Sequence, residues 1–181
     1  MNASPVLARL EAVLREQAGL MADLLSQGDA PVETHNGAGP AQIAASGPRA
    51  QTHSDEYELL VEAIYEGYLL HYGTPRVVRP PEADLGLLAG DQLYALGLAR
   101  LIALGDLAAV AELADVITLT ALAQGERRED LALAVWAAGA RAVGWGSSDS
   151  YRRAKTLVHA RDPEALRAMR VAAEPAEPPT S

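Results

Sequence analysis

Helical periodicity is the feature of this 181-residue sequence that most constrains its fold. Between residues 55 and 172, apolar side chains recur at steps of three and four residues, which is the spacing of one face of an α-helix. Ala and Leu, two strong helix formers, dominate the apolar residues, and Phe is absent. We therefore predict an all-α fold, and the short connections between the expected helices predict an antiparallel helical bundle.

Six helices are expected in this helical body, which spans residues 55–172. Gly, Asp and Pro residues mark most of their ends. The helices are expected near residues 55–72, 83–104, 107–124, 127–145, 148–160 and 163–172. The only extended-looking piece, residues 76–81, is a basic loop closed by two prolines. The predicted core consists of the large apolar residues on the inward faces: Leu60, Ile64, Leu88, Leu93, Leu96, Leu101, Val110, Leu113, Ile117, Leu122, Leu131, Val135 and Trp136.

A separate amphipathic helix is expected in residues 1–28, with Ser4 and Pro5 as its start signal. Residues 29–54 are predicted to be a flexible linker, because they contain almost no large apolar side chain to bury. Residues 173–181 are rich in proline and are predicted to be a disordered tail. The N-terminal helix presents an apolar face for interaction, made of Val6, Leu10, Val13, Leu14, Met21, Leu24 and Leu25.

This apolar face is too hydrophobic to stay in water, so the N-terminal helix must dock on another surface. The long linker would let it reach its own body, a second copy or a foreign subunit. A helix needed only for the chain's own core would not require so long a linker. We therefore expect an intermolecular target, with docking on the chain's own body as the alternative.

The net charge and the absence of cysteine exclude several classes of function. The formal charge of −9 disfavours general binding to nucleic acid. With no cysteine, the chain has no disulfide, thiolate metal site or cysteine nucleophile. The sequence shows no basic-then-apolar leader and no uncharged apolar run of about 20 residues. We expect a cytoplasmic protein with no nucleic-acid partner and no membrane insertion.

Charge is distributed unevenly along the body. Residues 55–71 are acidic, and Glu58, Glu62 and Glu66 form one carboxylate row at helical spacing. A di-metal site would need a second set of carboxylates and histidines, and no Glu-x-x-His occurs, so we expect a solvated acidic face, no metal and no cofactor. The segment 151–170 is basic, and it includes a candidate anion-binding group, Arg152, Arg153 and Lys155, for which pairing with the chain's own acidic helix is the alternative.

Three stretches of the body, taken in order, resemble the trans-prenyl diphosphate synthases, the polyprenyl synthetase family. Residues 61–71 (VEAIYEGYLLH) are similar to the helix V-E-x-x-H-x-x-x-L-x-H that leads into that family's first aspartate-rich motif. Residues 87–96 (LLAGDQLYAL) are similar to its L-x-A-G-D-x-L segment, which is the most specific of the matches. Residues 113–126 are similar to the helix that follows, and the whole resemblance covers residues 56–146.

The resemblance implies a helical fold and a reaction in which two D-D-x-x-D clusters hold magnesium against a diphosphate. This chain departs from that pattern, because it contains no Asp-Asp pair. If His71 takes the place of the family's histidine, Tyr72, Gly73 and Arg76 stand where the aspartates belong. A second register, which matches residues 71–75 to a later segment of the family, lacks the ligands too. We therefore assign no catalytic residue and expect no prenyl transfer.

The preferred hypothesis is a non-catalytic relative of these enzymes that acts as an accessory or protein-binding subunit, since interface packing and metal binding depend on different residues. The resemblance implies a heteromeric prenyl diphosphate synthase as the assembly, and a homo-oligomer is also compatible with it. Two alternatives stay open. One is an accessory subunit of an unrelated larger assembly, anchored by the N-terminal helix. The other is a diverged isoprenoid diphosphate enzyme that uses Glu58, Glu62 or Asp91 with magnesium.

Overall fold

The fold is all-α, as predicted. The computed structural model describes residues 5–17, 20–25 and 38–175, where the only extended pairing is an isolated antiparallel bridge between Leu25 and Val78. All six predicted body helices are present, with ends within two residues of the predicted ones. The helices are α1 (Pro5–Glu16), α2 (Leu20–Asp23), α3 (Pro40–Ala45), the 3-10 turn η1 (Gln51–His53), α4 (Ser54–Tyr72), α5 (Ala83–Ala103), α6 (Leu107–Gly125), α7 (Glu129–Trp145), α8 (Asp149–His159) and α9 (Ala165–Ala173).

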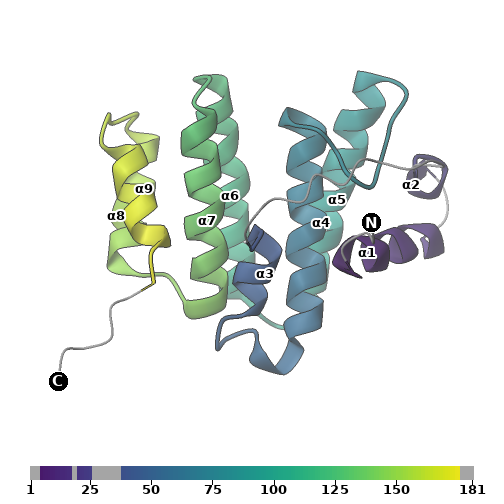
Figure 1. The fold of residues 1–181 in the computed structure, drawn as a ribbon, viewed down its shortest axis with the longest axis horizontal. Helices are drawn as coiled ribbons and strands as arrows, with labels where there is room; N and C mark the ends of the chain where they lie inside the picture. Colours follow the sequence, from purple (N-terminus) through teal and green to yellow (C-terminus); the bar gives the residue numbers. More distant parts are fainter. Residues whose placement is uncertain (1–4, 18–19, 26–37, 176–181) are drawn as a thin grey trace.

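The long body helices form two layers (Figure 1). In this view α5 lies behind α4 and α6 lies behind α7. α3 packs against both α4 and α7, while α8 and α9 close one end of the molecule. α1 and α2 close the opposite end beside α4. Successive body helices run antiparallel, as their short connections predict.

The main core draws on α3 to α9, with Trp136 and Tyr151 as its largest buried side chains. The prediction is wrong for Leu88, which is 56% exposed, because Ala89 and Leu93 take the inward face of α5. Of the other predicted core residues, four are half-buried, Leu96, Val110, Ile117 and Leu122. The rest are confirmed as buried: Leu60, Ile64, Leu93, Leu101, Leu113, Leu131, Val135 and Trp136.

The prediction of a flexible linker over residues 29–54 is wrong for its described part, residues 38–54. This part contains α3 and η1, and Ala41 and Ala44 are fully buried in the main core. Their methyl groups fill the space between α4 and α7, where larger side chains would not fit. Small residues therefore serve close packing here, whereas the sequence argument took them as a sign of flexibility. The remaining residues, 29–37, lie outside the described part of the chain.

Gly47 shows how tight this packing is. A Cβ atom on Gly47 would lie 2.2 Å from the carbonyl oxygen of Gly144 on α7, so any larger residue would force the segments apart. Arg49, two residues further on, also bonds to the helical body. The backbone N–H of Arg49 donates to the Gly144 carbonyl at 3.0 Å, and its guanidinium pairs with Asp106 at 2.7 Å.

The predicted N-terminal helix is two helices, α1 and α2, and residues 1–4, 18–19 and 26–28 lie outside the described part. Its apolar face is buried within the same chain, as in the intramolecular alternative, so the described face is not free for the intermolecular docking that we expected. The face packs on Leu59 and Ala63 of α4 and on Ala89 and Leu93 of α5. Val13 is half-buried, and the other predicted interaction residues are buried: Val6, Leu10, Leu14, Met21, Leu24 and Leu25.

The loop between α4 and α5 explains why this docking is intramolecular. Val78 pairs with Leu25 in the isolated bridge, and the backbone N–H of Arg79 donates to the carbonyl of Leu24 at 2.9 Å. The loop and α4 together thus hold the segment that follows α2. At the other end of the chain, α9 ends at Ala173, and residues 176–181 of the predicted tail lie outside the described part.

Asp106 ties three segments together at the start of α6. Its carboxylate caps the helix by accepting the backbone N–H of Ala109 at 3.0 Å, and it accepts the hydroxyl of Tyr57 at 2.6 Å. Arg49 provides a third donor. Burial alone would raise the pKa of the Asp106 carboxyl, but these donors hold the pKa below its ordinary value. Burial and the bond to Asp106 raise the pKa of Tyr57 to about 12.

Leu113→Ala is expected to lower the free energy of unfolding by about 2 to 5 kcal/mol, because Leu113 is fully buried in the main core. The matched change Leu133→Ala removes a side chain that is 57% exposed on α7. It should change stability by no more than about 0.5 kcal/mol. Urea denaturation of both variants measures the difference. Equal effects would contradict the assignment of the inward face.

Asp106→Asn is expected to weaken the dependence of stability on acid pH. Because the folded state lowers the pKa of Asp106, this carboxylate stabilises the fold above its unfolded pKa, and that contribution is lost as the pH falls through the folded-state pKa. Asparagine keeps the capping acceptor, so the change removes mainly the charge. Urea denaturation between about pH 7 and about pH 3 should give a flatter profile for the variant. Profiles of stability against pH that run parallel in the wild type and the variant would contradict the lowered pKa of Asp106 in the folded state.

Candidate protein interface

The carboxylate row on α4 is largely buried, so the predicted solvated acidic face is wrong for two of its three residues. Glu66 is fully buried and Glu62 is 5% exposed. One carboxylate oxygen of Glu66 accepts the backbone N–H groups of Arg76 at 2.6 Å and Val77 at 2.7 Å. The Arg76 guanidinium pairs with both carboxylates and lies 5.1 Å from the centre of the Tyr65 ring. The loop between α4 and α5 therefore supplies the partners that water would otherwise provide.

This cluster holds the loop in place and leaves no carboxylate of the pair free for a cation. Burial raises the pKa of Glu62, and the adjacent Arg76 only partly opposes that effect. Within the described residues, no group of three or more His, Asp or Glu side chains lies close enough to hold a metal ion. Glu58 is the third member of the row, and one of its carboxylate oxygens lies 3.8 Å from a guanidinium nitrogen of Arg9 on α1.

The segment that resembles L-x-A-G-D has a packing role on α5. A Cβ atom on Gly90 would lie 2.6 Å from the Cδ2 atom of His71, so a larger residue here would displace the histidine ring from its place between α4 and α5. The ring of His71 stacks on Tyr94 at 5.3 Å between ring centres. Its Nε2 atom lies 3.2 Å from a carboxylate oxygen of Asp91. Gly90 and Asp91 thus contact the side chain of His71, which lies at the end of α4.

The three candidate anion-binding residues are not gathered around a common site. Lys155 donates to Glu112 at 2.8 Å and to Asp115 at 2.7 Å, both on α6. Burial alone would lower the pKa of Lys155, but these two carboxylates raise it. Arg152 pairs with its neighbour Asp149 and donates to a backbone carbonyl at 2.7 Å, while Arg153 is exposed. The basic helix therefore pairs within the chain, but with α6 rather than with the acidic α4.

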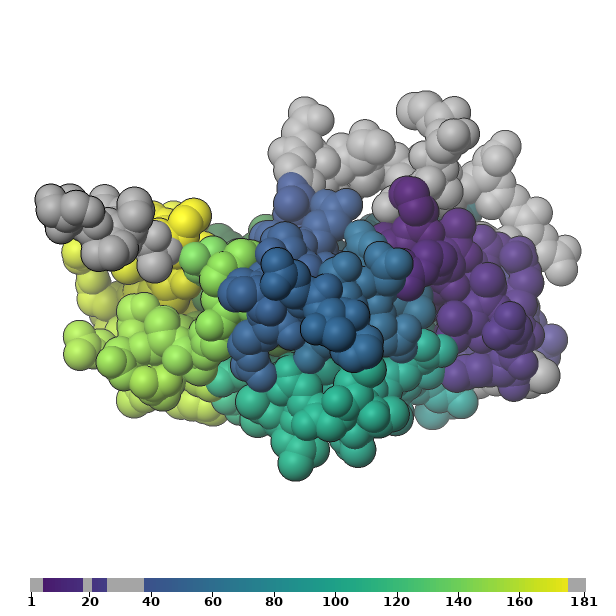
Figure 2. Space-filling view, turned by 90° about the horizontal axis from the view of Figure 1, so that it is seen from below, coloured from purple at the N-terminus to yellow at the C-terminus, as the bar shows by residue number. Residues whose placement is uncertain are grey.

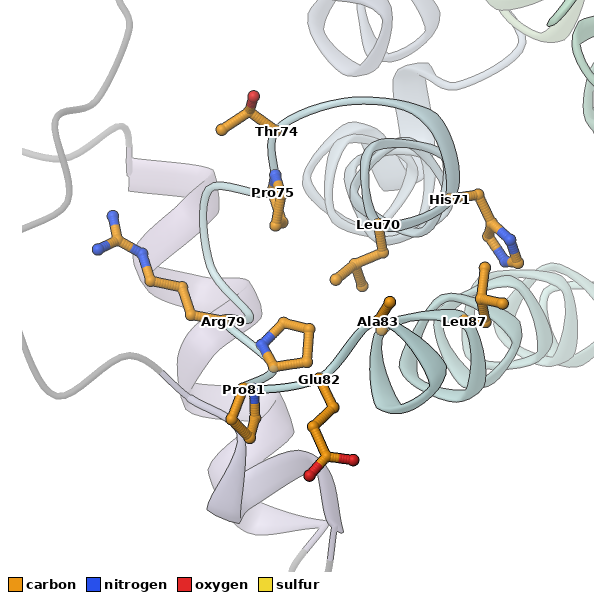
Figure 3. Close-up of a pocket in the computed structure, with 11 residues that line it drawn as sticks. Leu70, His71, Thr74, Pro75, Arg79, Pro81, Glu82, Ala83 and Leu87 are labelled. Carbon is orange, nitrogen blue, oxygen red and sulfur yellow. The ribbon is translucent and has the colours of Figure 1, made fainter.

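A pocket of about 500 Å³ lies between the end of α4, the following loop and the start of α5 (Figure 3). Leu70, Pro75 and Ala83 line its centre. The side chains of His71 and Arg79 point away from the centre on opposite sides. The pocket can accept an apolar group, but its polar side chains do not converge on a common point, as those of an active site do.

The outer side of α5 and α6 is the surface that most departs from an ordinary soluble helix pair. Both helices are long and apolar enough to cross a membrane, yet only 33% of the apolar stretch of α5 and 39% of that of α6 is buried. We define the α5–α6 face as the exposed residues opposite α4 and α7: Leu88, Gln92, Ala95, Ala99 and Ile102 on α5, and Leu107, Ala111, Ala114, Thr118, Ala121 and Gly125 on α6.

The residues that define the α5–α6 face are uncharged, and the exposed Asp91 lies beside them, three residues after Leu88 and four before Ala95. The two acidic residues of α6, Glu112 and Asp115, turn sideways to Lys155 on α8. Three large apolar side chains of the face are more than half exposed, namely Leu88, Ile102 and Leu107 at 56%, 56% and 67%. Figure 2 shows the surface around the α5–α6 connection (teal) protruding on the side of the molecule away from α3. An exposed apolar surface of this kind is a candidate interaction site.

Sequence reasoning missed this face because it assigned Leu88 to the core and did not consider the side of α6 that faces away from the core. The signal was present in the sequence, since α6 has no charged residue on the side away from α7. A surface helix of a soluble protein normally carries charges there. Compared with protein-family models, curated proteins and solved structures, the chain matches none of them.

Arg76→Met is expected to lower the free energy of unfolding by about 3 to 5 kcal/mol, because it leaves two buried carboxylates without their cation. The matched change Arg153→Met removes an exposed guanidinium on α8 and should cost no more than about 0.5 kcal/mol. Urea denaturation at neutral pH compares the two variants. A cost below 1 kcal/mol for Arg76→Met would contradict the role of the cluster as the anchor of the loop.

Proposed function

We propose that this chain is a non-catalytic helical subunit that binds another protein molecule through the α5–α6 face. One observation carries the proposal: in two helices that are apolar enough to cross a membrane, only 33% and 39% of the apolar stretch is buried within the single chain. An exposed apolar surface of this size favours association over the free state. The absence of charge on the face agrees with the depletion of charged residues at the centre of protein interfaces.

A protein partner is favoured over a lipid bilayer, and we propose a cytoplasmic location. α5 carries Asp84, Asp91 and Arg100 along its length, which a hydrocarbon environment disfavours. Beside α6, Lys155 forms ion pairs with two carboxylates. Inserting the hairpin would bring these charges to the bilayer, whereas docking a protein on the outer face leaves them at its margin.

The non-catalytic part of the proposal is supported by what the acidic residues do. Glu62 and Glu66 are held by Arg76, and within the described residues no group of three or more His, Asp or Glu side chains lies close enough to hold a metal ion. A diverged enzyme would need several carboxylates held together and free to bind magnesium. A role for the N-terminal helix as an anchor on another assembly is not favoured, because its apolar face is buried in its own chain. The sequence resemblance suggests the catalytic subunit of a prenyl diphosphate synthase as one class of partner.

The test is retention of a protein partner by tagged full-length chain in cells that also express a second copy with a different tag. The wild type should retain a partner, which is either a foreign protein or the second tagged copy. In Ala114→Glu the retained amount should fall at least tenfold, because the new charge would be buried at the interface. The matched control Ala12→Glu places the same charge on an exposed position of α1 and should retain the partner.

Two outcomes would contradict the proposed function. One is retention of the same proteins by all three forms, because the face would then play no part in binding. The other is turnover of allylic and isopentenyl diphosphates with magnesium by the purified chain, because the protein would then be an enzyme.

A further inference from the structure

We propose that the protein molecule covering the α5–α6 face is a second copy of this chain, packed antiparallel about a two-fold axis that passes Ala95. This inference rests on the proposed function and names its partner. It is argued from the spacing of the exposed residues, their sizes, the area available and the placement of charge.

The exposed residues of the face follow the spacing of a coiled-coil seam. On both helices they recur at alternating steps of four and three residues, which is the heptad pattern of positions that pack against a facing helix. In a single-chain protein such a seam would be buried, but here it points to the outside. The seam of α5 is Leu88, Gln92, Ala95, Ala99 and Ile102, and that of α6 is Leu107, Ala111, Ala114, Thr118, Ala121 and Gly125.

The seam of α5 is complementary to itself in the antiparallel direction. Ala95 lies midway between Leu88 and Ile102, seven residues from each. A two-fold axis at Ala95 therefore places Leu88 of one copy beside Ile102 of the other. Under the same axis Gln92 is level with residue 98 of the other copy, one position before Ala99. Ala95 meets its own counterpart, where two methyl groups allow the helices to approach closely.

The seam of α6 shows the same self-complementarity. When it is reversed on itself, Leu107 lies beside Gly125, which pairs the most exposed large side chain of the face with the residue that has none. Ala111 lies beside Ala121 in the same register. Matching of large with small side chains across facing helices is what close packing requires.

One two-fold axis can serve both helices. Ala95 lies ten residues before Gly105 in the connection, and residue 116, the midpoint of the α6 seam, lies eleven residues after it. The midpoints of the α5 and α6 seams are therefore at nearly the same height along the antiparallel pair of helices. Two such hairpins stacked on this axis form a four-helix arrangement, with α5 on α5 and α6 on α6.

The area of the face meets the requirement of a stable dimer. α5 has 21 residues and α6 has 19. At about 1.5 Å per residue each is about 30 Å long, and two adjacent helices are about 20 Å wide. The face thus offers about 600 Å² per copy and about 1,200 Å² in total, which is the lower end of the range for specific interfaces.

Charge placement also favours a second copy. Two chains with a formal charge of −9 repel each other unless they meet at a surface free of charge. The α5–α6 face comes near this condition, because its defining residues are uncharged, Asp84 and Asp91 lie at its margin, and Lys155 pairs with both carboxylates of α6 and offsets one of their two charges. An uncharged face has no electrostatic preference for a foreign basic or acidic partner, whereas it matches its own copy.

Cysteine cross-linking tests the axis, because the full chain has no native cysteine. In the full-length protein, Ala95→Cys should form a disulfide-linked dimer when a mild thiol oxidant is added. The matched variant Ala99→Cys lies on the same face but off the axis, so its two copies would be about 12 Å apart along the helices and should not cross-link. Cross-linking of Ala99→Cys at the rate of Ala95→Cys or faster would overturn the register.

Sedimentation of the purified full chain from about 1 µM to about 100 µM tests the dimer itself. The wild type and Ala12→Glu should sediment at twice the chain mass of 19.1 kDa. Ala95→Glu and Ala95→Lys should each associate at least about tenfold more weakly, with unchanged helical circular dichroism. Mixing these two variants should restore a dimer, because opposite charges then meet on the axis.

Each remaining outcome overturns the second-copy proposal. A monomeric wild type at the highest concentration would do so while leaving the proposed function intact, provided that Ala114→Glu still loses a foreign partner in cells. Binding of the wild type to vesicles of phosphatidylcholine and phosphatidylglycerol in place of dimerisation would assign the face to a membrane. A dimer that persists in both Ala95 variants would place the interface elsewhere.

Discussion

The buried carboxylate of Glu66 is the interaction on which the N-terminal half of the fold depends. It accepts backbone N–H groups from successive residues of the α4–α5 loop, and these groups would otherwise be buried without partners. By holding this loop against α4, it positions Val77 and Val78 as one wall of the cluster that receives α1 and α2. Leu25 then pairs with Val78 on that wall. An ion pair that anchors the loop thus decides where a distant helix can dock.

The sequence predicted the long helices well, because each one buries a face against a neighbour and the periodicity records that face. It failed over residues 38–54, where burial depends on small side chains. Ala41 and Ala44 are fully buried, although neither contributes much apolar area. Gly47 lies against the backbone of α7 at a distance that no other residue allows. Close packing of this kind leaves the same composition as a flexible linker, so composition alone does not separate the two.

The candidate site was harder to predict, because the partner of each charged residue comes from another element. The spacing of Glu62 and Glu66 correctly placed them on one face of α4, but nothing in the spacing showed that Arg76 folds back over them. Likewise, the basic segment was recognised, whereas its pairing of Lys155 with α6 depends on how α8 crosses that helix. Local patterns determine which residues share a face, and tertiary packing determines what that face meets.

In α5, the local residue pattern and the tertiary packing can both be followed. On its inner side, Gly90 allows the close approach of His71, and Gly97 sits against Ile64 of α4. On its outer side, Ala95 and Ala99 offer a second surface on which a helix can approach closely. A helix with close-packing surfaces on opposite sides, and with its charges confined to the flanks, suits the middle of a helical assembly rather than its surface. The single chain fills only the inner side, and we infer that the outer side is filled by association.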